Sequence, residues 1–94
     1  MRLGVFGISS GTTFGPGTTA RLARRCEELG YDRWWRGEHV VLPSPRVAPA
    51  PMGPTDPILD PLVHLAFVAA VTERMLLGTG IIILPQRNPL VLAK

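Results

Sequence analysis

The residues of this sequence best suited to chemistry are an adjacent acid and histidine, Glu38 and His39. They follow a short aromatic segment and precede an apolar stretch that carries a proline, so they stand where a strand would end. Histidine titrates near neutral pH and can donate or accept a proton, and a neighbouring carboxylate can orient it or accept a hydrogen bond from a ligand. The pair therefore indicates proton chemistry, with a solvated loop histidine and a solvated acid as the alternatives.

Two glycines, Gly78 and Gly80, interrupt an otherwise apolar segment late in the sequence. Glycine inside a strand marks a bulge or the close approach of another group to the backbone. The two glycines therefore indicate either a ligand against the strand or a helix packed tightly on it. Ser9, at the end of the first apolar run, is a further candidate, here for contact with a substrate.

Three other features suggest less chemistry. His64 lies among apolar residues, and Cys26 lies on the apolar side of an expected helix, so both are predicted to pack in the core. The glycine-rich loop at 11–17 has neither the spacing nor the lysine of a phosphate-binding loop. Two isolated histidines and one cysteine give no metal-ligand spacing, so no metal site is predicted.

Apolar runs and turn signals predict alternating strands and helices. Strands are expected over residues 3–8 and 31–36 and from 75 or 76 to 84, and helices over 19–29 and 62–75 and from 90 onward. The first strand has no polar alternation and is expected to be buried on both faces. This order is typical of an α/β fold with parallel strands and right-handed crossovers.

Short motifs mark where the helices begin and end. Gly30 follows the last apolar residue of the first helix, where glycine can adopt the left-handed conformation that ends a helix with little strain. Asp60-Pro61 and Asn88-Pro89 each combine an N-cap residue with proline at the first helical position.

The second strand and the segment after it differ from the rest of the chain. Arg33 and Arg36 would point to opposite faces of the sheet, so either the strand ends early or at least one arginine is poorly solvated. Seven of the ten prolines fall within 43–61. Because proline lacks an N–H donor and biases the preceding residue away from helix, residues 40–60 are predicted to form a long irregular loop.

Composition excludes several classes of protein. The 94 residues are 46% apolar and 18% charged, and the net charge of +3 is scattered, which argues against a nucleic-acid-binding surface. The longest apolar run, 65–71, is far shorter than the roughly 20 residues that span a bilayer. A single cysteine suits a reducing compartment, and the first residues lack the apolar region of a signal peptide, so a cytoplasmic location is expected.

Three stretches of the sequence carry a family resemblance. They are RRCEELGYD at 24–32, WRGEHVVLP at 35–43, and TERMLLGTGI at 72–81, followed by LP at 84–85, NP at 88–89 and AK at 93–94. Together they resemble the bacterial-luciferase-like superfamily of flavin and deazaflavin oxidoreductases. The third stretch is the most specific, and the similarity spans nearly the whole chain apart from 44–55.

The resemblance implies a (β/α)8 TIM barrel with its cofactor at the C-terminal ends of the strands. Such a barrel needs about 250 residues, so residues 1–94 are expected to form the N-terminal part of a single barrel domain, about the first three βα units. The parent protein is expected to be an oxidoreductase or monooxygenase and a homodimer. The 94 residues alone are expected to be inactive.

The resemblance also implies roles for individual residues. His39 matches the proton-handling residue of the deazaflavin branch, and Glu38 stands where the family commonly has Asp. Cofactor contacts are implied for five residues: Glu38, Gly78, Gly80, Ile81 and Ile83. Related enzymes hold a non-prolyl cis peptide bond that maps onto Gly80–Ile81.

The histidine motif favours hydride transfer between a small organic substrate and the deazaflavin coenzyme F-420. Two alternatives stay open at this stage. One is a monooxygenase of the same superfamily that depends on flavin mononucleotide (FMN). The other is a non-catalytic truncated chain that only packs against other protein. The residues do not identify the substrate.

Overall fold

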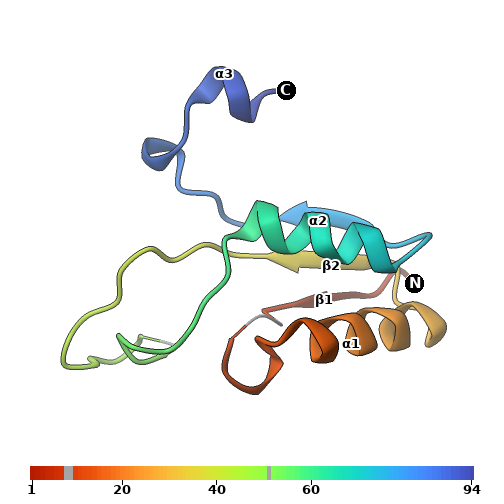
Figure 1. Cartoon of the computed structure of the whole chain (residues 1–94), viewed down its shortest axis with the longest axis horizontal. Helices are drawn as coiled ribbons and strands as arrows, with labels where there is room; N and C mark the ends of the chain where they lie inside the picture. The colour runs from red at the N-terminus through yellow and green to blue at the C-terminus, as the bar shows by residue number, and fades with distance from the viewer. Residues whose placement is uncertain (8–9, 51) are drawn as a thin grey trace.

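The chain folds as a three-stranded parallel sheet with two helices beside it, in a computed structural model that describes residues 1–7, 10–50 and 52–94 (Figure 1). The strands are adjacent in chain order. The bounds are β1 Gly4–Phe6, α1 Pro16–Glu28, β2 Arg33–Arg36, α2 Pro61–Val71, β3 Leu76–Thr79 and α3 Pro89–Leu92, with short 3-10 helices at Gly11–Thr13 and Leu84–Gln86. The predicted parallel α/β order is confirmed.

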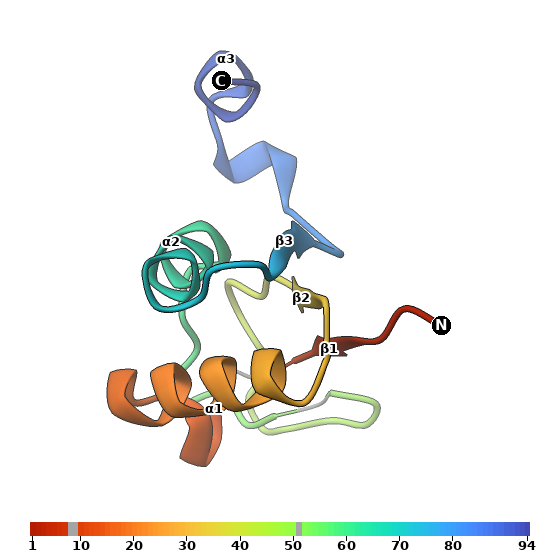
Figure 2. The same ribbon diagram turned by 90° about the vertical axis from the view of Figure 1, so that its right-hand side faces the viewer.

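Helices α1 and α2 lie on the same face of the sheet, and α3 projects away from it (Figure 2). Trp34 in β2 is fully buried beneath the two helices. Its neighbours in register are Val5 and Leu77, which pack against the same core. The buried hydrophobic residues of this core are Ala23, Trp34, Leu65, Val68 and Met75.

The opposite face of the sheet is uncovered. Phe6 is 61% exposed and Trp35 is 37% exposed, and Leu76 is exposed beside them. The expectation that the first strand is buried on both faces is therefore wrong for the described part of that strand. The reason is that both crossover helices cover one side, while alternate strand residues point to the other.

The two arginines of β2 point to opposite faces, as their spacing predicts. Arg36 lies on the same face as Trp34 and is only 2% exposed. Its Nη2 donates a hydrogen bond to the carbonyl of Leu59 at 2.9 Å, whereas Arg33 is partly exposed. The strand thus continues to Arg36, and the buried arginine is satisfied in part by the backbone of the loop before α2.

Helix boundaries differ from the predicted ones at two ends. Helix α1 begins at Pro16, three residues early, and Thr19 is an internal residue whose hydroxyl donates to the carbonyl of Thr13 at 3.0 Å. Helix α2 ends at Val71 rather than at residue 75, because Thr72 is extended and its hydroxyl donates back to Val68 O at 2.8 Å.

The predicted helix signals are otherwise confirmed. Gly30 has φ 87° at the end of α1. Asp60 Oδ1 accepts from the N–H groups at the start of α2, at 2.9 and 3.1 Å, and Asn88 caps α3 in the same way. No helix within the described residues is long and apolar enough to cross a membrane.

The third strand is shorter than predicted, ending at Thr79 rather than at residue 84. Gly80 still donates to the carbonyl of Arg36 at 2.7 Å, but β2 ends there and offers no further ladder partner. The N–H of Ile83 instead meets the side chain of Glu38. The three isoleucines at 81–83 therefore leave the sheet edge.

The segment between β2 and α2 is irregular, as its prolines predict. Its one regular contact within the described residues is an isolated antiparallel bridge between Ser10 and Ile58, which joins it to the loop after β1. The loop therefore folds back over the C-terminal ends of the strands, where the residues with predicted functions lie.

Candidate functional site

A cavity of about 270 Å³ lies where the strands of the sheet end. Its walls come from the segments that follow β1 and β2 and from the residues just after β3, with the proline-rich loop on one side. The lining residues are Phe6, Gly7, Ser10, Arg36, Gly37, His39, Met52, Ile58 and Ile81. The fold thus gathers residues from three distant parts of the chain at the expected end of the sheet.

His39 is the residue of this cavity best able to move a proton. Its side chain is exposed, and it also borders the shallow surface hollows formed by the proline-rich loop. An exposed imidazole at the end of a strand can exchange protons with both solvent and a bound molecule. The role that its motif predicts stays a prediction.

The two glycines of the third strand make room for aromatic rings. An added Cβ at Gly78 would lie 2.6 Å from Cζ3 of Trp35, and one at Gly80 would lie 3.0 Å from Cε2 of Phe6. Gly78 is in register with Trp35 on the uncovered face, so these rings, and not a packed helix, approach the backbone. The glycines therefore allow a flat apolar surface to form there.

The peptide bond between Gly80 and Ile81 is trans, contrary to the expectation from related enzymes. The cis bonds among the described residues are Ser44–Pro45 and Ala48–Pro49. A non-prolyl cis bond costs roughly 3–4 kcal/mol and persists only where surrounding structure holds it. Ile81 is 58% exposed, so nothing in the described chain supplies that constraint.

Glu38 does not present a free carboxylate to the cavity. It is 7% exposed, and its Oε2 accepts a hydrogen bond from the N–H of Ile83 at 2.6 Å. Its Oε1 accepts from Nη2 of Arg87, which also donates to Oδ2 of Asp60 at 2.7 Å. Both oxygens of Glu38 are thus used to join three segments of the chain.

The hydrogen bonds between Arg87 and Asp60 shift the pKa values of both groups. Burial alone would raise the pKa of Asp60, but hydrogen bonds from Arg87 and from the first N–H groups of α2 outweigh it and lower that pKa. Hydrogen bonds to Asp60 and Glu38 raise the pKa of Arg87. Burial lowers the pKa of Arg36, an effect that the charge of Asp60 opposes. The charged forms of the Arg87–Asp60 pair are therefore favoured.

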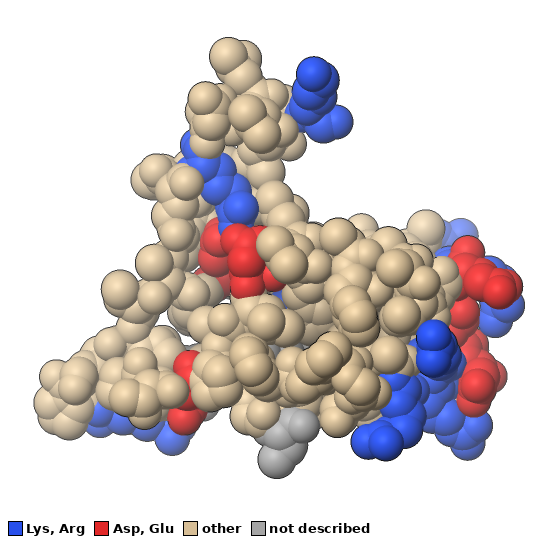
Figure 3. All heavy atoms as spheres, viewed as in Figure 1, with Lys and Arg blue, Asp and Glu red and all other residues tan. Residues whose placement is uncertain are grey.

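A second carboxylate, Glu27, organises the other end of the sheet. It accepts hydrogen bonds from the N–H groups of Glu73, Arg74 and Met75, at 3.2, 2.6 and 2.8 Å. The bond from Arg74 contributes most to lowering the pKa of Glu27. Charged side chains gather mainly at this end of the molecule, around the end of α1, while the surface over α2 is largely uncharged (Figure 3).

The predicted cofactor-binding residues fit a planar redox coenzyme only in part. Phe6, Gly80 and Ile81 form an apolar wall suited to a flat ring, and His39 lies beside them. Glu38 fits poorly as an acceptor for a coenzyme hydroxyl, because its oxygens are already used. Ile83 is held by Glu38 and does not line the cavity. Ser9 lies outside the described residues.

Sequence reasoning missed Arg87 and Glu27 altogether. Arg87 immediately precedes the Asn88-Pro89 helix start, and only the fold brings it to Glu38, 49 residues away in sequence. Glu27 lies one helical turn after the buried Ala23, and its carboxylate caps the backbone before β3. In the sequence, Glu27 is one of two adjacent acids near the end of α1, which does not indicate such a contact.

Comparison with known proteins gives one consistent result. The model of the family described as luciferase-like monooxygenase matches residues 1–94. Proteins named luciferase-like monooxygenase from Escherichia coli strain K12 and from strain O6:H1 are each 34% identical over 73 residues. The match covers 78% of this chain but 18% of each relative. No solved structure matches the chain.

Proposed function

Because this chain belongs to the luciferase-like monooxygenase family, we propose that it forms the N-terminal part of an oxidoreductase built as a (β/α)8 barrel. Three adjacent parallel strands, with α1 and α2 on one face of the sheet, support this proposal, because each strand with its crossover helix would form one unit of such a barrel. The uncovered face, with Phe6 and Trp35, corresponds to the barrel interior. The greater length of the relatives supports this view.

The proposed reaction is hydride transfer between a small organic substrate and coenzyme F-420. The observation that carries it is the exposed His39 beside an apolar wall at the ends of the strands. The bound coenzyme would supply the hydride chemistry. Oxidation of an alcohol, for example, removes a hydride from carbon and a proton from oxygen, and in this proposal the imidazole of His39 takes that proton.

In this proposal Glu38 positions the site and does not contact the coenzyme. Its carboxylate fixes the backbone of Ile83 and, through Arg87, the start of α2. The adjacent His39 is therefore attached to a rigid point, with its own side chain left free. Phe6 and Ile81 would bound one face of the coenzyme ring.

A monooxygenase that uses FMN is the second candidate, favoured by the name of the relatives. Such an enzyme would use the same apolar wall but would consume molecular oxygen. The two candidates therefore differ in the coenzyme that they bind and in the co-substrate that they need.

The test uses protein produced from the complete reading frame that contains these 94 residues. F-420 and FMN differ in absorbance, so the spectrum of the purified protein after incubation with each coenzyme, followed by gel filtration, identifies the one retained. We expect retention of F-420, its reduction in a screen of small alcohols, and no oxygen uptake. A flavin spectrum with oxygen consumption would instead support the monooxygenase.

His39 is tested with any alcohol that reacts in this screen. His39→Asn removes the proton acceptor and is expected to lower kcat by at least about 100-fold, with coenzyme affinity nearly unchanged. Val40→Ala, at the exposed neighbouring position, is the matched control. An unchanged kcat in His39→Asn would show that His39 takes no part in the reaction.

A further inference from the structure

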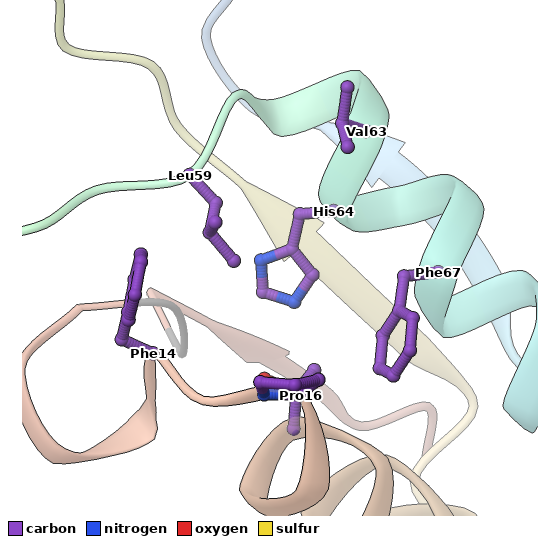
Figure 4. Close-up of a pocket in the computed structure, with 7 residues that line it drawn as sticks. Phe14, Pro16, Leu59, Val63, His64 and Phe67 are labelled. Carbon is purple, nitrogen blue, oxygen red and sulfur yellow. The ribbon is translucent and has the colours of Figure 1, made fainter.

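A second cavity, of about 280 Å³, lies between α1 and α2 on the helical side of the sheet (Figure 4). It shares no lining residue with the cavity that holds His39. Its walls are almost wholly carbon, from Phe14, Pro16, Leu59, Val63 and Phe67. By comparison, a cavity of about 150 Å³ lined by apolar side chains holds a benzene molecule. This cavity is therefore large enough for a substituted benzene ring.

Two polar side chains, Thr19 and His64, line this apolar space. The hydroxyl of Thr19 already donates to the carbonyl of Thr13 at 3.0 Å, so His64 is the one that could pair with a ligand. Its ring extends from α2 toward Pro16, between Leu59 and Phe67 (Figure 4). His64 is 1% exposed, and neither ring nitrogen has a hydrogen-bond partner within the described part of the chain. The expectation that His64 packs in the core is confirmed, but its ring has no hydrogen-bond partner among the described residues. An unpaired buried polar group costs about 1–3 kcal/mol.

The charge state of His64 limits what it can bind. Burial, together with the nearby charge of Arg36, lowers the pKa of His64 to about 4. The ring is therefore neutral at pH 7 and offers one donor and one acceptor. The neutral ring itself offers no positive charge to an anion. A hydroxyl group, in contrast, can pair with either nitrogen.

We propose that this cavity is a binding site for a small neutral molecule of the phenol class, whose hydroxyl hydrogen-bonds to His64. The aromatic rings of Phe14 and Phe67 favour an aromatic body through edge-to-face or offset contacts. The site is separate from the proposed redox site and goes beyond the proposed function. Its occupancy would also fix the distance between α1 and α2.

The experiment compares two probes that differ by one hydroxyl, 4-ethylphenol and ethylbenzene. They are titrated into protein from the complete reading frame whose histidine rings carry ¹⁵N. We expect 4-ethylphenol to bind about five- to tenfold more tightly, the worth of one hydrogen bond to a buried group. We also expect it to shift the ring nitrogens of His64 and not those of His39, which separates this site from the redox site.

Three variants locate the binding. His64→Leu should bind both probes equally, because the apolar space remains and the hydrogen bond is lost. Val63→Trp should block the cavity at its exposed edge and abolish binding of both probes. Ala69→Trp adds the same bulk to an exposed position of α2 that does not line the cavity, and should leave both affinities unchanged.

The comparison of probes in the unaltered protein tests the proposal even where a variant fails to fold. Equal affinity for the two probes, or saturable binding that leaves the nitrogens of His64 unshifted, would overturn it. Failure of both probes to bind at millimolar concentration would also overturn it. The cavity would then be either filled by another protein segment or left without a ligand.

Discussion

Arg87 donates a hydrogen bond from its guanidinium group to the buried carboxylate of Glu38. This contact joins the segment after β3 to the segment after β2, 49 residues apart in the chain. Because the same nitrogen also reaches Asp60 at the start of α2, one side chain fixes three segments at the ends of the strands. His39, next in sequence to Glu38, takes its position from this cluster.

Removal of the guanidinium group should destabilise the protein. Arg87→Met keeps the aliphatic stem but leaves the buried carboxylate of Glu38 without its charged partner. We expect the melting temperature to fall by several degrees, measured by circular dichroism. Arg21→Met, at an exposed position of α1, is the matched control and should change it little. Equal melting temperatures for the two variants would argue against a positioning role for Arg87.

Glu27 should make stability depend on pH in the acid range. Its pKa in the folded protein lies below the ordinary value of 4.5, so its stabilising effect is complete above that value and is lost as the pH falls further. Glu27→Gln should therefore lose stability at pH 7 and show a flatter decline between pH 5 and pH 3, as read from urea unfolding midpoints. Glu28→Gln, at the exposed neighbouring position, should keep the pH dependence of the unaltered protein.

His64 should make stability depend on pH in a different range from Glu27. Its pKa is about 4 in the folded protein and 6.5 ordinarily, so between these values the unfolded chain binds more protons. Stability is then complete above pH 6.5 and falls as the pH is lowered, by about 2.5 kcal/mol at pH 4.5. The difference in free energy of unfolding between the protein and His64→Leu should change by this amount over the window. A constant difference would contradict the buried neutral state.

The aromatic rings on the uncovered face should make Gly78 hard to replace. Gly78→Ala places a Cβ against the ring of Trp35 and should cost about 1–2 kcal/mol of stability. Gly17→Ala is the matched control, because it meets nothing within 4 Å and lies in α1. That change should stabilise the protein by about 0.5–1 kcal/mol. In denaturant unfolding, we expect the free energy of unfolding to fall in Gly78→Ala and to rise in Gly17→Ala.

The fold followed from signals that act locally. The Asp60-Pro61 pair begins α2 as predicted, because an N-cap carboxylate and a proline at the first helical position are fixed by neighbouring backbone alone. The parallel order of strands also followed, from alternation of apolar runs and helices. Gly30 likewise ends α1 with positive φ.

The parts that the sequence did not predict depend on contacts between distant residues. The third strand ends early because β2 stops at Arg36, and the N–H of Ile83 then pairs with Glu38, a contact that no local pattern indicates. Arg87 was missed for the same reason. His64 was correctly expected in the interior, but the lack of partners for its ring depends on where α1 packs. The contacts of these residues follow only from the tertiary fold, which brings distant segments together.

The most direct test of the proposed oxidoreductase is a fluorescence titration of F-420 and of FMN with protein from the complete reading frame. We predict saturable binding of F-420 at micromolar concentration or below, and weaker binding of FMN. Ile81→Glu, which places a charge on the apolar wall, should weaken F-420 binding at least about tenfold, whereas Leu84→Glu, exposed and outside the cavity, should not. Tighter binding of FMN, or binding of F-420 that Ile81→Glu leaves unchanged, would contradict the proposed site and coenzyme.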